Sequence, residues 1–245
     1  MKEAAEQLKA TGQSKKFRLF QQADMTDNGI VFVTCDQGHK TAMVHTSRKY
    51  QILFESGCLA LLDGYTNEAV SSFSAALERT YEFFLRVAYR KLGIPASLFN
   101  STWKEIRNHS ERQYGAFVVL YPIISGESFA LPGHVSEFRN KVIHKGYIAT
   151  YDEVFRYASE IYLMIRQIRG VLNEKCPTEM WAEINEAKDV QRAAVPEGMD
   201  CAFLGTTDYD ARPDLTAFEE CMNEIKREIE GLSEKRPEGC PLRNG

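Results

Sequence analysis

Hydrophobic positions in the middle of the chain recur with the period of an α-helix. In residues 66–92 apolar side chains are spaced three, four and seven residues apart, and the segment ends in a glycine followed by a proline stop. Residues 150–172 repeat this pattern and open on Thr150 with Glu153 three positions later, the sequence of a capping box. Shorter helices are predicted at about 47–62, 97–107, 110–124 and 134–147. The pattern therefore predicts a bundle of about five or six helices.

The two ends of the chain follow other patterns. Before the bundle, residues 17–20, 29–35 and 40–46 are short, β-prone and separated by turn residues, which indicates a small β element. After Asn173 the sequence is loop-like, with a candidate strand at 199–205. An amphipathic helix is then predicted at 214–231, followed by a polar tail at 233–245 that is expected to be disordered.

The expected fold is therefore mainly α and divides into three parts. Residues 1–46 hold a polar N-terminus and the small β element, and residues 47–172 form the helical bundle. Residues 173–245 form a C-terminal extension with its own amphipathic helix.

Composition and charge limit the partners of this fold. The formal net charge is −4, which argues against coating a nucleic acid through bulk charge but leaves room for a local basic cleft. The N-terminus has no apolar signal region, and no stretch is long enough to span a bilayer, so no membrane partner is expected. The six cysteines include no CxxC pair and are expected to be reduced thiols in a cytoplasmic protein.

The segment Arg-Asn-Lys-Val-Ile-His at residues 139–144 concentrates polar chemistry on one helix. At about 100° per residue, three apolar side chains form its core-facing stripe: Val135, Phe138 and Val142. Asn140 and His144 are four apart and neighbour each other away from that stripe. Arg139 lies between the two faces, and its long side chain can reach the polar one. The alternative interpretation is an ordinary solvated helix face.

This segment, RNKVIHKG, resembles the signature of the HEPN family, which is an arginine, a polar residue, three further residues and a histidine. Arg139, Asn140 and His144 occupy these positions, and the neighbouring long helices fit the all-α bundle of that family. The resemblance covers roughly 47–172. It implies a HEPN-like fold with metal-independent endoribonuclease activity, no cofactor and a homodimer cleft, often in bacterial toxin or antiviral-defence systems.

The resemblance gives Arg139, Asn140 and His144 the catalytic roles, and their chemistry fits RNA cleavage. A guanidinium can grip the scissile phosphate, and an imidazole can move a proton from the 2′-hydroxyl or to the leaving 5′-oxygen, which yields a 2′,3′-cyclic phosphate. Two copies about a two-fold axis would supply two histidines. Lys141 and Lys145 are the predicted RNA-binding residues of this cleft. An antitoxin or another regulatory protein is a further candidate partner.

Glu78 is predicted to support the site by facing the motif and orienting Arg139 through a charge-assisted bond. The alternative is that Glu78 and Glu82 both form surface pairs with the arginines of their own helix, Arg79 and Arg86.

Two other functions remain open. Some HEPN-like domains keep the fold without the activity, so the chain could be a catalytically silent module that binds a partner protein or RNA.

Cys35 and His39, with His45 beyond them, suggest half of a zinc ribbon, but zinc needs four ligands and no second cysteine pair lies nearby. A degenerate β-hairpin is the simpler interpretation of that segment, and no metal is assigned to the site.

Overall fold

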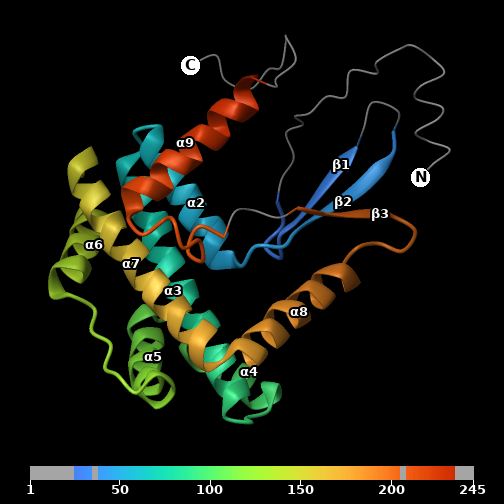
Figure 1. Cartoon of the computed structure of the whole chain (residues 1–245), viewed down its shortest axis with the longest axis horizontal. Helices are drawn as coiled ribbons and strands as arrows, with labels where there is room; N and C mark the ends of the chain where they lie inside the picture. Colours follow the sequence, from blue (N-terminus) through green and yellow to red (C-terminus); the bar gives the residue numbers. More distant parts are fainter. Residues whose placement is uncertain (1–24, 35–37, 205–207, 235–245) are drawn as a thin grey trace.

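The computed structural model describes residues 25–34, 38–204 and 208–234. This part of the chain is mainly helical and carries one small sheet (Figure 1). Its helices are α2 Lys49–Leu62, α3 Thr66–Lys91, α4 Ala96–Ile106, α5 Ser110–Ser125, α6 Gly133–Lys145, α7 Tyr151–Lys175, α8 Pro177–Ala193 and α9 Phe218–Glu234. The strands are β1 Ile30–Thr34, β2 Lys40–His45 and β3 Asp200–Leu204.

The predicted helices and the mainly α class are confirmed, with one correction after residue 176. Residues 177–193 form α8, where the sequence was expected to be loop-like. Pro177 occupies the first turn of this helix, where the missing N–H has no intrahelical partner to lose, so the proline starts the helix and does not break it. The predicted disordered tail at 233–245 begins two residues too early, because α9 extends to Glu234. The predicted strand at 17–20, the polar N-terminus and the rest of the tail, 235–245, lie outside the described residues.

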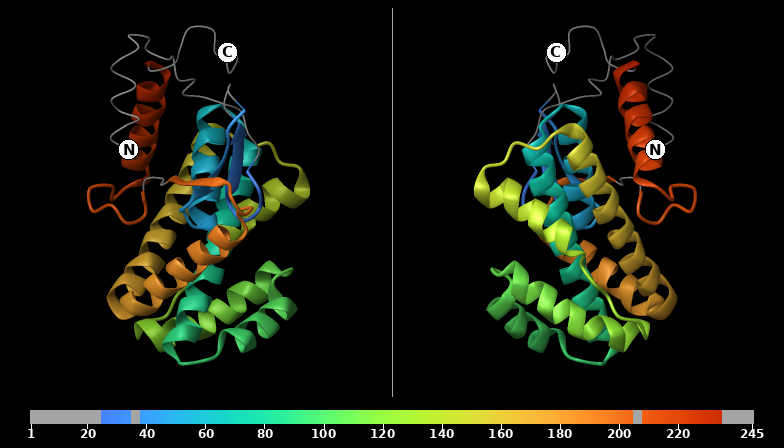
Figure 2. Two further views of the ribbon diagram at one scale, coloured as in Figure 1. Left: turned by 90° about the vertical axis from the view of Figure 1, so that its right-hand side faces the viewer. Right: turned by 90° about the vertical axis from the view of Figure 1, so that its left-hand side faces the viewer.

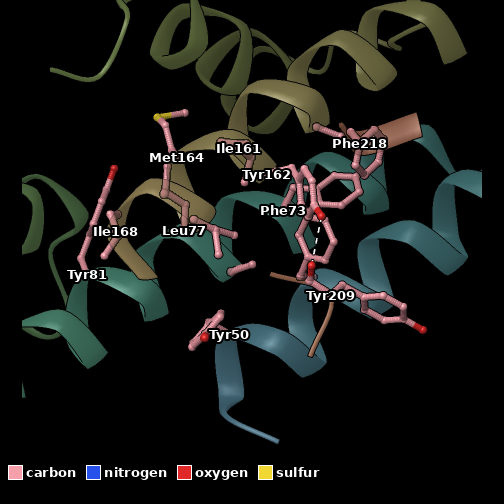
Figure 3. Packing of buried hydrophobic residues seen from close by; sticks show 14 of the residues in the cluster. Tyr50, Phe73, Leu77, Tyr81, Ile161, Tyr162, Met164, Ile168, Tyr209 and Phe218 are labelled. Atoms are coloured by element: carbon pink, nitrogen blue, oxygen red, sulfur yellow. Dashed lines mark hydrogen bonds between the residues drawn. The ribbon is translucent and has the colours of Figure 1, made fainter. Parts of the chain in front are cut away.

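The long helix α3 forms the centre of the bundle. It packs against α2, α4, α5, α6, α7 and α8, and residues on more than one of its faces are buried. Figure 2 shows α4 and α5 as a pair of helices at the end of the bundle away from α9. Aromatic side chains fill the core where α2, α3, α7 and α9 meet. The Phe54 and Phe218 rings pack against each other, and each packs against the rings of Phe73 and Tyr162. Figure 3 shows Phe73, Tyr162 and Phe218 in this cluster.

The sheet joins two segments that are far apart in the sequence. β1 and β2 form the antiparallel hairpin that the sequence predicts, and β3 adds to the other edge of β2 in parallel. Thr41 thus pairs with Asp200, and His45 with Leu204. The sheet has its own small core of Ile30, Ala42 and Val44, against which Val195 and Met199 pack.

The segment that follows β3 is part of the main core. Its buried residues include Leu215, Phe218, Cys221, Met222 and Ile225. Asp210 is also buried, and its carboxylate accepts hydrogen bonds from the Tyr50 hydroxyl at 2.7 Å and the Gln51 amide at 2.8 Å. The C-terminal region therefore completes the bundle that the earlier helices begin.

Candidate functional site

The motif helix α6 is oriented by its apolar stripe. Val135 and Val142 are buried in the main core, and Phe138 packs on the Tyr157 ring with 5.3 Å between ring centroids. The helix ends at Gly146, whose φ of 67° is the left-handed conformation that glycine adopts without strain. The predicted core-facing stripe is confirmed, and Asn140 and His144 are exposed away from it, with Arg139 partly buried between the two faces.

The segment that follows α6 is fixed to both long helices. Asn67 on α3 donates to the Tyr147 carbonyl at 3.1 Å and accepts from the Ala149 N–H at 3.2 Å. The Tyr147 hydroxyl donates to Glu153 at 2.9 Å, and Glu153 also forms the predicted capping box with Thr150. These bonds hold the end of the motif helix in a defined position relative to α3 and α7.

Arg139 is tied to α3 by an ion pair. Its Nη2 lies 3.2 Å from Oε1 of Glu78, and its Nη1 donates to the Asn140 side-chain carbonyl at 3.3 Å. The side chains of Arg139 and Glu78 are 27% and 25% exposed, so the pair is only partly shielded from water. Glu82 instead pairs with Arg79 and Arg86 on its own helix. Of the two carboxylates considered in the sequence, Glu78 is the one that reaches the motif.

Arg139 and Asn140 line a cleft between α3, α5, α6 and α7. The cleft has a volume of about 150 Å³, and Glu78, Glu111, Tyr81, Tyr114 and Tyr157 are among its other lining residues. The Tyr157 hydroxyl lies 2.8 Å from the Ser74 hydroxyl. Burial raises the pKa of Tyr157 to about 12, so this side chain enters any chemistry near neutral pH as a neutral hydroxyl.

The remaining residues of the predicted site lie outside this cleft. His144 and Lys145 are exposed at the C-terminal end of α6 and are not among the lining residues. The Lys141 ammonium lies 3.3 Å from the centroid of the Tyr147 ring, a cation–π contact that holds it on the protein surface. The structure therefore brings Glu78, Arg139 and Asn140 together, and it places His144 further along the same helix.

Sequence reasoning missed the tyrosines of the cleft. Tyr81, Tyr114 and Tyr157 each lie on the apolar side of their own helix, where a sequence pattern indicates a core residue. The rings of all three make aromatic contacts in the core. The signal that could have identified them is the hydroxyl group of each side chain. A buried tyrosine usually needs a hydrogen-bond partner, so a tyrosine at a core position can mark a polar site within the core.

The described residues contain no group of three or more His, Cys, Asp or Glu side chains that could hold a metal ion. Cys35 of the suggested zinc ribbon lies outside the described residues. His45 is buried in the sheet, and burial lowers its pKa.

None of the helices described in the structure combines the length and apolar character needed to cross a membrane. Comparisons of the chain with known protein families, curated proteins and solved structures give no significant match. The function is therefore inferred from the residues of this chain.

Proposed function

We propose that this chain is a metal-independent endoribonuclease of the HEPN type that cleaves RNA at a groove shared by two copies. A cytoplasmic role as a toxin or antiviral-defence effector belongs to the same proposal. One observation carries it: Arg139 is held by Glu78 at a cleft beside Asn140, and His144 is exposed one helical turn beyond Asn140. Residue types that are able to bind phosphate and to transfer protons thus occur on one helix.

The guanidinium of Arg139 would bind the scissile phosphate. It carries five N–H donors, and the contacts with Glu78 and Asn140 engage only Nη2 and Nη1. A phosphate at this position would receive charge-assisted hydrogen bonds that strengthen as negative charge develops in the transition state. Asn140 would help to fix the guanidinium plane, and Lys141 and Lys145 would contact neighbouring phosphates.

His144 would transfer the protons. The imidazole can accept a proton from the 2′-hydroxyl or donate one to the leaving 5′-oxygen. Attack by the 2′-hydroxyl on the phosphorus breaks the bond to the 5′-oxygen and leaves a 2′,3′-cyclic phosphate. Because His144 does not line the cleft of its own chain, we assign this role to a groove in which the α6 helices of two copies face each other.

The surface around the motif supports this pairing. Ile143, Ile148 and Tyr151 are large hydrophobic side chains with exposed fractions of 37%, 80% and 45%. They flank His144 in the sequence, and their burial against a second copy would be favourable.

A second candidate is a catalytically silent module that binds RNA or a partner protein, such as an antitoxin. Two observations favour it: Glu78 already offsets the charge of Arg139, and His144 stands apart from the cleft. The two candidates differ in whether RNA is cut.

The deciding experiment is incubation of the full chain with RNA in excess chelator. We expect cleavage that leaves 2′,3′-cyclic phosphate ends, while DNA of the same sequence stays intact because it lacks the 2′-hydroxyl. His144→Ala should slow cleavage by about two to four orders of magnitude. Arg139→Lys should recover little activity relative to Arg139→Ala, since lysine lacks the guanidinium fork.

The matched control is His134→Ala. His134 is also an exposed histidine of α6, but it pairs with Glu160 on α7 and belongs to neither the motif nor the cleft. Its loss should leave cleavage unchanged. Intact RNA after incubation with the folded wild-type protein would favour the silent module.

A further inference from the structure

The turn between α4 and α5 carries unpaired positive charge. Lys104, Arg107 and Arg112 are exposed, and none of them forms an ion pair with a residue that the structure describes. Arg112 donates to the Glu105 backbone carbonyl at 3.1 Å, so its charge is not offset by a carboxylate. Most of the arginines in the described residues are paired with carboxylates instead, among them Arg48, Arg79, Arg86, Arg90, Arg212 and Arg227. In a chain with a net charge of −4, this turn is therefore a local site for a negatively charged partner.

Gln113 fixes this turn to the bundle. The residue is 1% exposed, and its amide nitrogen donates to the Arg107 carbonyl at 2.6 Å. Its amide oxygen accepts from Arg79 on α3 at 2.7 Å. These bonds use the backbone of Arg107 and leave its guanidinium without a partner among the described residues. The turn is thus ordered before any ligand binds, which lowers the entropy that is lost on binding.

The turn continues into the cleft that contains Arg139. Ser110 and Glu111, the first residues of α5, line this cleft from the α5 side. On the α6 side, Lys141 and Lys145 follow Arg139 and are exposed. Lys145 lies about 9 Å beyond Arg139 along the helix axis. Basic side chains therefore occur both on the α5 side of the cleft and along α6 beyond it.

Two carboxylates limit how this surface can attract a partner. Glu105 and Glu111 are exposed in the same stretch, so residues 104–112 carry two acidic side chains beside the three basic ones. This small excess of positive charge argues against binding through bulk charge. It favours contacts between individual arginines and phosphates, which the guanidinium fork makes as paired hydrogen bonds.

We propose that the α4–α5 turn is a phosphate-binding surface on which Arg107 and Arg112 guide a single RNA strand towards Arg139. The proposal rests on the proposed ribonuclease function, because it takes the cleft as the place where the strand is cut. Proteins that bind single strands hold the backbone in a groove lined by cations. Here the strand would pass from the turn across the cleft and on to Lys141 and Lys145 of α6.

The test measures RNA binding at several salt concentrations. It uses the full chain with His144→Ala, so that the RNA is not cut during the titration, and a labelled oligouridylate of about twelve nucleotides. Each phosphate contact adds about 0.7 to the slope of log K against log salt concentration for a single strand. The double variant Arg107→Ala/Arg112→Ala should therefore lower the magnitude of this slope by about 1.4 and weaken binding by about tenfold or more at about 0.1 M salt. An unchanged slope, or no RNA binding by the parent protein, would overturn the surface.

Two control variants separate phosphate contacts from general effects. Arg192→Ala removes another exposed arginine without an ion pair in the described residues, but Arg192 lies over the Phe203 ring beside the sheet. Figure 1 shows the sheet on the opposite side of the bundle from α6, so this variant should leave the slope unchanged. A loss equal to that of the double variant would reject a local surface. Arg107→Lys/Arg112→Lys keeps both charges and the backbone bond from Gln113, so it should retain most of the slope. A loss as large as with alanine would show that charge at these two positions does not hold the strand.

The outcomes for the surface and for the nuclease can be told apart. RNA binding that depends on Arg107 and Arg112, in a protein that never cuts RNA, supports the surface and rejects the nuclease. Cleavage by the wild-type protein, with unchanged RNA binding in the double alanine variant, rejects the surface and leaves the nuclease standing.

Discussion

The Glu78 carboxylate on α3 lies 3.2 Å from the Arg139 guanidinium on α6 and joins residues that are 61 positions apart. This contact restricts the arginine side chain before any substrate binds. Pre-orientation of this kind lowers the entropy that is lost when a phosphate is gripped, while the carboxylate also offsets part of the positive charge. The balance of these two effects decides whether Glu78 assists or weakens the site.

We expect Glu78→Gln to lower RNA cleavage by about tenfold or more, because the guanidinium loses its fixed orientation. The free energy of unfolding should change by less than about 1 kcal/mol, since the ion pair is partly exposed. Single-turnover cleavage and urea unfolding would measure the two effects. Glu82→Gln is the control, because Glu82 binds Arg79 and Arg86 and should not affect cleavage. Unchanged cleavage by Glu78→Gln would show that the pair does not support catalysis.

Asp210→Ala should destabilise the fold by about 3 kcal/mol or more. The substitution leaves the Tyr50 hydroxyl buried without its acceptor and removes one of the two carboxylates to which the Gln51 amide donates. It also removes the carboxylate near the buried Arg169. Chemical denaturation of the full chain would measure the loss. Asp208→Ala is the comparison. Asp208 pairs with Arg48 and accepts from the Gln51 amide, but its side chain is 44% exposed and Gln51 keeps Asp210 as an acceptor, so we expect a cost of about 1 kcal/mol or less. If both variants lost the same free energy of unfolding, burial of the Asp210 carboxylate would not be the reason for its contribution to stability.

Phe218→Ala should cost about 3–5 kcal/mol, because it leaves a cavity among several aromatic rings of the main core. Phe218 is 2% exposed, whereas its neighbour Glu219 is exposed at the surface of the same helix. Glu219→Ala should therefore change stability by about 0.5 kcal/mol or less. A thermal melt that is equally unaffected by both substitutions would mean that the C-terminal helix is not part of the cooperative core.

Stability should be lost at alkaline pH. Burial raises the pKa of Tyr157 to about 12 and holds the pKa of Tyr50 well above its ordinary value. The unfolded chain loses these protons near pH 10, so stability is fully present below about pH 10 and falls as the pH rises towards about 12. Tyr157 alone would account for about 2 kcal/mol by pH 12.

Urea unfolding measured between about pH 8 and pH 12 tests this expectation. Tyr157→Phe should have a shallower alkaline slope than the wild type, while Tyr65→Phe, at a residue that is 59% exposed, should follow the wild type. Parallel curves for the wild type and Tyr157→Phe would show that this hydroxyl does not drive the loss.

The sequence predicted the elements whose signals are local. The helical spacing of apolar residues in α3 and α7, the capping box at Thr150 and the stripe of Val135 and Val142 on α6 all appear in the structure. Local signals were ambiguous at Pro177, because proline is common both in loops and at the first position of a helix.

Contacts between distant segments could not be predicted in the same way. A glutamate at position 78 can pair with its own helix or with another one, and only packing decides which occurs. The same holds for Tyr81, because helical spacing cannot distinguish a tyrosine that only fills the core from one that also lines a cleft. The polar part of the candidate site thus depends on tertiary structure that periodicity does not encode.

The parallel pairing of β3 with β2 has a consequence for how the chain folds. During synthesis the β1–β2 hairpin emerges before helices α2–α9 of the described residues, and its partner strand follows only after α8. Until then one edge of β2 has open hydrogen-bonding groups, which can pair with another nascent chain. Closing so long a loop is slow compared with helix formation. We therefore expect sheet closure to be a late kinetic step, and chains that end before residue 200 to be prone to aggregate through this exposed strand edge.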